Sequence, residues 1–280
     1  MNLILQGLAA DRSTIDRIAT MADAQRIVQL NPDAYRCEGV GYSDALKTKI
    51  DSECFAARLD YAFVEAGRKL GDFSLVAMDM DSTLITIECI DEIADMQGLK
   101  PQVAEITEAA MRGEIEFRES LTRRVSLLKG LDASALQRVY EERLKLSPGA
   151  EKMLAAVQAA GLKTLLVSGG FTFFTDRMKT RLGLDYTHSN ELEIVDGKLT
   201  GKVVGSIVDA DEKKNTVERV CRELDISPKE AIVMGDGAND LKMMGISGMS
   251  VAFRAKPVVR AQADVALNFV GLDGILPLFD

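Results

Sequence analysis

Short apolar runs alternate with amphipathic stretches from residue 74 to the end of the chain. Four of these runs have the length of strands, namely Leu75–Met78, Lys163–Val167, Ala231–Met234 and Ser250–Ala252. Strands that are apolar throughout, with no alternating polar face, are typical of a parallel sheet that helices cover on both sides. The pattern therefore predicts an α/β fold with a doubly wound parallel sheet.

Four helical stretches separate the first of these strands from the second. They are Ile87–Met96, Gln102–Met111, Ile115–Leu128 and Ala133–Leu144. A connection of this length inside a compact domain is usually a functional insertion. Ligands of parallel sheets bind beyond the carboxyl ends of the strands, so we expect these helices to form a small cap over a cleft there.

A β-hairpin is predicted where Asp196-Gly197, a signal for a type I′ turn, separates Glu191–Val195 from Lys198–Val204. We expect this hairpin to be structural. His188, the only histidine of the chain, lies just before it. Catalysis of the Ser-His-Asp or Cys-His type would have to use this residue, and a surface or hairpin role is the better interpretation.

The first seventy residues have a different pattern. It predicts a strand at Asn2–Leu8, a helix at Ser13–Asp23, one or two strands near Gln25–Gly41, and a long helix from Ser43 to Leu70. We interpret this segment as a separate small α/β domain whose role could be scaffolding, dimerisation or the sensing of a small ligand. The predicted division is residues 1–70 for this domain, 71–86 and 146–280 for the core, and 87–145 for the cap.

Composition narrows the class of protein. The chain is 47% hydrophobic and 28% charged, which is typical of a soluble globular protein. Its formal charge is −9 and no block of Lys and Arg is present, which disfavours nucleic acid as a partner. The apolar N-terminal run is too short to span a membrane, so we expect a cytoplasmic protein. Four scattered cysteines predict reduced thiols rather than disulfides or a zinc site.

Two carboxylates follow the first core strand in the motif DMDST. Side chains two apart on an extended segment point the same way, so Asp79 and Asp81 can face one cleft. Two anions there repel each other unless a cation relieves them, and Mg²⁺ prefers oxygen ligands. On its own the motif could equally be a turn or a helix cap.

The second strand ends in Ser168-Gly169-Gly170. Glycines allow backbone N–H groups to approach an anion, and the serine hydroxyl donates another hydrogen bond. A plain strand-to-helix turn would have the same residues. Further on, Lys213 or its neighbour Lys214 could supply the positive charge that a phosphorylated small molecule needs, and composition does not choose between them.

The third strand ends in GDGAND, which places Asp236, Asn239 and Asp240 on one glycine-rich loop. The carboxyl ends of parallel strands meet at one edge of a sheet, so these groups should join those of the first two motifs. Two more acids at this edge complete a set of oxygen ligands for a divalent ion. Polar groups of complementary type at three strand ends are hard to explain as turns alone.

Taken in order, DMDST, Ser168, Lys213 and GDGAND resemble the four motifs of the haloacid dehalogenase superfamily of phosphotransferases. The resemblance covers about residues 74 to 270 and is closest to the phosphoserine phosphatase branch. It implies a Mg²⁺-dependent hydrolase that converts O-phospho-L-serine to L-serine and phosphate, the last step of serine biosynthesis. The spacing of the family's lysine ahead of its last motif matches Lys213 rather than Lys214.

The resemblance also implies roles. Asp79 would be the nucleophile that forms a phospho-aspartyl intermediate, and Asp81 the general acid and base. Asp79, the backbone carbonyl of Asp81, and Asp236 would hold Mg²⁺, and Asp240 would orient the waters of the ion. The implied phosphate-binding residues are Ser168, Gly169, Lys213 and Asn239.

Substrate recognition should lie in the cap. Written as a helix, residues 115–128 place Arg124 on the face that carries Phe117, whereas Arg123 points about 100° away. An arginine that faces the cleft can hold a carboxylate through two parallel hydrogen bonds. The phosphoserine phosphatase branch lines its pocket with a glutamate, a methionine, a phenylalanine and an arginine. Glu88, Met111, Phe117 and Arg124 stand at the matching positions.

Two alternatives to hydrolysis remain open. A phosphotransferase of the same branch would pass the phosphoryl group from Asp79 to an acceptor alcohol such as homoserine. A regulatory protein would bind an amino acid in residues 1–70 and carry a vestigial phosphatase core, which the intact motifs argue against. The partner expected in either enzyme is a small molecule, with no membrane or nucleic acid, and a homodimer is left open.

Overall fold

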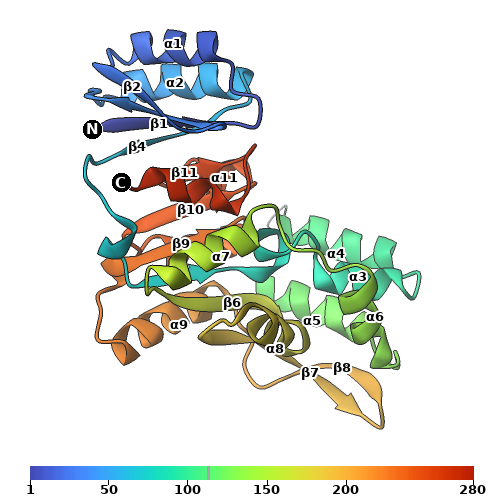
Figure 1. The fold of residues 1–280 in the computed structure, drawn as a ribbon. Helices are drawn as coiled ribbons and strands as arrows, with labels where there is room; N and C mark the ends of the chain where they lie inside the picture. The colour runs from blue at the N-terminus through green and yellow to red at the C-terminus, as the bar shows by residue number, and fades with distance from the viewer. Residues whose placement is uncertain (112–113) are drawn as a thin grey trace.

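The computed structural model describes residues 1–111 and 114–280, without the side chain of Met111. Figure 1 shows a small N-terminal sheet with two helices at one end of the molecule, a large central sheet, and a group of cap helices beside it. Among the described residues, no helix has both the length and the apolar character needed to cross a membrane. Our division of the chain into domains stays a prediction from the sequence.

The central sheet has seven strands in the order β11-β10-β9-β5-β6-β7-β8. Neighbouring strands run parallel except for the last pair, β7 and β8, which is antiparallel. The four core strands predicted from apolar runs are all present, and β5 has the predicted bounds. The strands are β5 (Leu75–Met78), β6 (Lys163–Phe171), β7 (Tyr186–Val195), β8 (Lys198–Val204), β9 (Ala231–Gly235), β10 (Met249–Phe253) and β11 (Val265–Leu267).

Helices cover both faces of this sheet, as expected for a doubly wound fold. On β5, Val76 and Met78 pack into one apolar cluster and Leu75 and Ala77 into another, because successive side chains of a strand point to opposite faces. The first cluster includes α7 (Ala150–Ala159) and α8 (Thr172–Leu182). The second includes α9 (Ala210–Glu223), α10 (Leu241–Met244) and α11 (Pro257–Arg260).

Between β5 and α7, the described residues form four cap helices close to the predicted positions: α3 (Cys89–Asp95), α4 (Lys100–Met111), α5 (Phe117–Leu127) and α6 (Ser134–Glu142). The hairpin is also present. Asp196 and Gly197 have φ values of 50° and 74°, positive at both central positions as a type I′ turn requires. Leu199 of β8 donates its backbone N–H to Leu131 between α5 and α6, so the hairpin supports the cap.

The N-terminal domain is a four-stranded antiparallel sheet in the order β2-β3-β1-β4. Its two helices and one face of the sheet form a separate apolar cluster, whereas Ile4, Ala62 and Val64 on the other face pack into the first cluster of the core. In chain order the elements are β1 (Asn2–Gln6), α1 (Arg12–Met21), β2 (Arg26–Asn31), β3 (Ala34–Glu38), α2 (Asp44–Ala56) and β4 (Asp60–Val64). All four cysteines of the chain are free and buried.

The predicted helix from Ser43 to Leu70 is wrong in its second half. Helix α2 ends at Ala56, and β4 follows and pairs with β1. The stop is a Schellman motif: Arg58 has a φ of 56°, and Leu59 donates its N–H to the carbonyl of Cys54. Glycine normally occupies the left-handed position of this motif, so an arginine there gave no signal in the sequence.

Buried polar contacts join the N-terminal domain to the core. The carboxylate of Asp60 on β4 is 1% exposed and accepts hydrogen bonds from the backbone N–H groups of Asn268, Phe269 and Val270. Gln6 of β1 donates to the carbonyl of Gly274 at 2.8 Å. The domain is therefore docked against the strand-β11 side of the large sheet, as Figure 1 shows.

Candidate active site

Asp79 directly follows β5, at the carboxyl end of the central strand of the sheet. Its side chain is 5% exposed, and its Oδ1 accepts the backbone N–H of Met80 at 2.7 Å. Burial raises the pKa of Asp79 above its usual value, and the charge of Lys213 opposes that effect. The chain turns sharply after this residue, with Ser82 at a φ of 56°, which brings Asp81 to the same cleft.

Lys213 is completely buried beneath this site. Its Nζ lies 2.8 Å from Oδ2 of Asp79 and 2.7 Å from Oδ1 of Asp240. Burial lowers the pKa of Lys213, but the charges of Asp240 and Asp79 more than offset this and leave it above its usual value. Lys214 points away and pairs with Glu218 on the surface. The geometry therefore selects Lys213 for the site.

The third strand end is held by a tight loop. Asp240 is fully buried, and its Oδ2 accepts the backbone N–H groups of Asp236 at 3.1 Å and Gly237 at 3.0 Å. A Cβ on Gly235 would stand 2.3 Å from that oxygen, so only glycine fits where the strand turns. Thr83 donates its hydroxyl to Asp236 at 3.3 Å and links this loop to the first motif.

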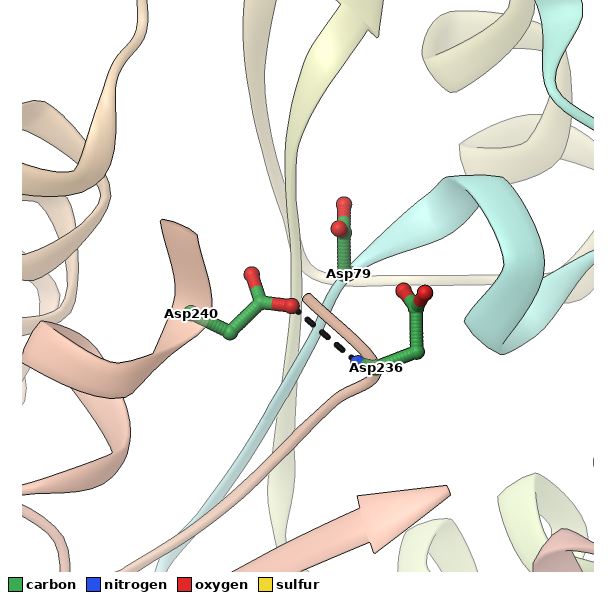
Figure 2. A group of neighbouring side chains, drawn as sticks. All are labelled: Asp79, Asp236 and Asp240. Carbon is green, nitrogen blue, oxygen red and sulfur yellow. Dashed lines mark hydrogen bonds between the residues drawn. The ribbon is translucent and has the colours of Figure 1, made fainter. Parts of the chain in front are cut away.

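Asp79, Asp236 and Asp240 form a cluster that suits a hard cation. One carboxylate oxygen of each lies within 4.8 Å of the others. Figure 2 shows the three side chains around a common space, with Asp240 bonded to the backbone N–H of Asp236. Both oxygens of Asp240 are already engaged, one by Lys213 and one by this loop. The carboxylates of Asp79 and Asp236 also accept hydrogen bonds, so all three residues offer polarised oxygen atoms, the donor type that Mg²⁺ prefers.

The Ser168-Gly169-Gly170 loop closes the site from β6. The Oγ of Ser168 is fully buried and accepts the backbone N–H of Gly170 at 2.9 Å. A Cβ on Gly170 would meet Oδ2 of Asp81 at 2.9 Å, so glycine is needed for the close approach of the two motifs. Asn190 of β7 orients this loop, because its amide donates to the carbonyl of Gly169 at 2.7 Å.

Asp81 has the properties of a proton donor. Its Oδ1 is buried and has no hydrogen-bond partner among the described residues. Burial, and after it the charge of Glu88, raise the pKa of Asp81 to about 8. A carboxyl group with such a pKa holds its proton at neutral pH and can give it to a leaving group.

These motifs open into a cavity of about 650 Å³ between the strand ends and the cap. Glu88, Phe117 and Arg124 line it from the cap side, and Ser168, Gly169 and Asn239 line it from the core. Lys213 and Asp240 lie beneath its floor, in contact with the residues that line it. The side chain of Met111 lies outside the described part of the chain.

Arg124 faces the cavity and Arg123 does not, as the helical geometry predicted. Arg123 is 54% exposed and pairs with Glu119 on the surface. Arg124 is half-buried, and burial lowers the pKa of its guanidinium, although the carboxylates of Asp91 and Glu88 oppose that effect. Its Nε has no hydrogen-bond partner among the described residues.

The charged or polar residues of the cavity that were missed from the sequence include Asp91, Ser120 and Lys256. A signal existed for each. Lys256 comes after the fourth predicted strand, and ligands of a parallel sheet bind beyond the carboxyl ends of its strands. Asp91 and Ser120 lie three residues after Glu88 and Phe117 on their helices, at a spacing that shares a helical face.

Comparison with known proteins shows the family to which the chain belongs. A family model of haloacid dehalogenase-like hydrolases matches residues 73–248. A phosphoserine phosphatase of Polaromonas sp. is 59% identical over 215 residues, which are 75% of this chain and 91% of that protein.

Solved structures agree with this. A probable phosphoserine phosphatase from Vibrio cholerae is 36% identical with a TM-score of 0.84, and the match covers 99% of this chain and 86% of that one. A phospho-aspartyl intermediate analogue of a phosphoserine phosphatase is 36% identical with a TM-score of 0.70, over 74% of this chain and 99% of that one. The Vibrio structure thus matches both the core and the N-terminal domain.

Proposed function

The chain belongs to the haloacid dehalogenase-like hydrolase family, and on this premise we propose that it hydrolyses O-phospho-L-serine to L-serine and phosphate. The observation that carries the proposal is the buried ammonium of Lys213, held between the carboxylates of Asp79 and Asp240. The charge of Lys213 opposes the rise in the pKa of Asp79 that burial causes, and so it favours the ionised carboxylate that a nucleophile requires. The names of the relatives, phosphoserine phosphatases at up to 59% identity, support the substrate.

The first chemical step transfers the phosphoryl group to Asp79. A carboxylate oxygen of Asp79 attacks phosphorus, and the bond from phosphorus to the serine oxygen breaks. The electron pair stays on that oxygen, which takes the proton of Asp81. The raised pKa of Asp81, about 8, supports this role, because the carboxyl group is protonated at neutral pH before the step begins.

The second step returns the enzyme to its starting state. Asp81, now a carboxylate, accepts a proton from a water molecule as the water oxygen attacks phosphorus. The bond from phosphorus to Asp79 breaks and inorganic phosphate leaves. Ser168, the backbone N–H of Gly169, Asn239 and the ammonium of Lys213 bind phosphoryl oxygens, so their donors stabilise the charge that the transfer spreads over them.

The residues of the site fit Mg²⁺. When bound, this ion would neutralise negative charge on the transferring phosphoryl group. The carboxylates of Asp79 and Asp236 and the backbone carbonyl of Asp81 would hold the ion, all of them oxygen donors. The carboxylate of Asp240 positions Asp236 by accepting the backbone N–H of Asp236, and it keeps Lys213 in place through their ion pair.

The cap supplies recognition of the amino acid. Arg124 binds the substrate carboxylate, and Glu88 binds the ammonium group. Phe117 packs close to Gly169, where a Cβ would meet its ring at 3.1 Å, and so it closes the cavity over the phosphate-binding loop. Met111, the fourth residue implied by the family resemblance, remains a prediction, as does a homodimer.

Phosphate release from a panel of phosphorylated amino acids and sugars, with and without added Mg²⁺, tests this function. We expect phosphoserine to have the highest kcat/KM, a strict need for the metal, and no turnover by Asp79→Asn. Asp72→Asn, a substitution outside the cavity, is a matched control and should keep the activity. Phosphohomoserine that forms faster than free phosphate in the presence of homoserine would instead establish a phosphotransferase.

A further inference from the structure

The cap wall of the cavity carries polar side chains that the sequence did not single out, among them Asp91, Ser120 and Thr107, whose hydroxyl already donates to the carbonyl of Val103. Asp91 lies three residues after Glu88 on α3, and Ser120 lies one helical turn before Arg124 on α5. Both line the cavity. Residues three or four apart share a face of a helix, so each stands beside a residue that the proposed function assigns to substrate.

Buried polar atoms on this wall lack partners. The Oδ1 of Asp91, the Oγ of Ser120 and the Nε of Arg124 make no hydrogen bond to any described residue. Ser120 is only 1% exposed and still does not bond to a carbonyl of its own helix, as a buried serine commonly does. A buried polar atom without a partner costs free energy, so three on one wall indicate a polar ligand that completes them.

Opposite charges on this wall face each other without pairing. Among the carboxylates near Arg124, Asp91 is the one whose charge acts most strongly on it, yet the described structure contains no ion pair between them within 4.0 Å. Glu88 is already bonded to the hydroxyl of Ser82 at 2.6 Å. A ligand with its own positive and negative groups can satisfy both residues at once, and a free α-amino acid group is such a ligand.

We propose that Asp91 and Ser120 bind the amino-acid end of the substrate. Asp91 accepts an N–H of the ammonium group together with Glu88, and the hydroxyl of Ser120 donates to the carboxylate beside Arg124. This inference rests on the proposed function and deepens it. Two residues instead of one then bind the ammonium group of the substrate, and two bind its carboxylate. The enzyme therefore selects against phosphomonoesters that lack either group.

Substrate analogues separate the two contacts. O-phosphoethanolamine keeps the ammonium group and lacks the carboxylate, 3-(phosphonooxy)propanoate keeps the carboxylate and lacks the ammonium, and p-nitrophenyl phosphate lacks both. We expect Asp91→Asn to lower kcat/KM about 10-fold for phosphoserine and phosphoethanolamine and to leave the other two within about 2-fold. We expect Ser120→Ala to lower it several-fold for phosphoserine and 3-(phosphonooxy)propanoate only.

Matched variants on the same helices control for indirect effects. Asp95→Asn on α3 removes the same charge, and Ser126→Ala on α5 removes an exposed hydroxyl. Both should leave the four kcat/KM values unchanged. If Ser120→Ala does not fold, as shown by its thermal melt, Ser120→Cys keeps the volume and replaces it.

The proposal fails if Asp91→Asn or Ser120→Ala lowers kcat/KM by the same factor for all four compounds, or changes none. The first result would mean that these residues only hold the cap in shape. A failure of the proposed function looks different. In that case the wild-type protein turns over p-nitrophenyl phosphate but prefers another natural phosphomonoester to phosphoserine.

Discussion

The two walls of the catalytic cavity differ in how completely their polar groups are partnered. On the core wall, Lys213, Asp79 and Asp240 form a closed set of contacts in which each charge meets an opposite charge or a backbone N–H. On the cap wall, Asp91, Ser120 and Arg124 each keep a buried atom that has no partner among the residues that the structure describes. Among the described residues of the core wall, the proton donor Asp81 is the exception, because its buried Oδ1 has no partner. The rest of the core wall is thus organised before substrate arrives, whereas we propose that substrate completes the cap.

This difference separates chemistry from selectivity. The partially charged oxygens of a transferring phosphoryl group gain most from donors that need no rearrangement, and the core offers these. Recognition needs groups that are satisfied only by the correct ligand, because the wrong ligand then leaves them unpaired in a desolvated site. The core and cap should therefore respond differently to substitution.

The largest effect is expected in the core. Lys213→Met removes the cation between two buried carboxylates, so Asp79 and Asp240 would repel each other without compensation. We expect the loss of activity on every phosphomonoester, by about 1,000-fold or more, and a fall of about 3–5 kcal/mol in the free energy of unfolding. Urea unfolding measures the free energy of unfolding, and turnover of p-nitrophenyl phosphate measures the activity. The neighbouring substitution Lys214→Met should change neither quantity. If Lys213→Met were as stable as the wild type, the contacts of Lys213 with Asp79 and Asp240 would not stabilise the core as described.

A cap substitution should change selectivity instead. Arg124→Met removes the partner of the substrate carboxylate, and we expect kcat/KM for phosphoserine to fall about 100-fold or more. Turnover of p-nitrophenyl phosphate should stay within about threefold of wild type, because that compound has no carboxylate. Arg123→Met on the outer face of the same helix is the control. An equal loss on both substrates would remove the distinction between the walls.

Metal binding should depend on pH through the core carboxylates. In protein without a bound cation, burial raises the pKa of Asp236 to about 7, and the charge of Asp240 adds to this. A cation has to displace that proton, so Mg²⁺ affinity should rise as pH increases through about 7 and level off above it. Calorimetric titration on both sides of that pH measures the affinity. An affinity that falls with rising pH would be inconsistent with a carboxylate site.

The smallest effect is expected at Lys256, which lines the cavity and is exposed. Its backbone N–H donates to the carbonyl of Asp236, and its charge lowers the pKa of Asp236 less than burial raises it. In a protein with a net charge of −9, this ammonium should attract the phosphate dianion. Lys256→Met should lower kcat/KM about two- to fivefold at low salt, and less at high salt. Lys202→Met, with the same change of charge on β8, should show no such salt dependence.

Most of the core could be predicted from the sequence, and the reason is physical. Strands such as β5 and β9 are buried on both faces, so their apolar runs and the polar residues after them are visible without a structure. The end of α2 was invisible because an arginine, Arg58, takes the left-handed position where a glycine would have signalled the stop.

Site residues at the ends of strands could be predicted from the sequence, whereas those on the cap helices could be predicted only in part. Asp79 and Asp236 directly follow strands and were found by that rule, and Ser168 lies near the carboxyl end of β6, which extends beyond its predicted end at Val167. Asp91 and Ser120 share helices with Glu88 and Arg124, but the sequence does not show which residue of a helical face reaches a cavity and lacks a partner. That depends on how α3 and α5 pack over the strand ends, which is a tertiary property.

We expect the carboxylate of Asp79 to carry the phosphoryl group during turnover. Rapid acid quench of the protein with phosphoserine and Mg²⁺, followed by mass spectrometry of the peptides, tests it directly. The expected result is one added phosphoryl group on the peptide that contains Asp79, which disappears as substrate is exhausted and is absent in Asp79→Asn. Steady release of phosphate with the group on another residue, or on none at any quench time, would contradict it.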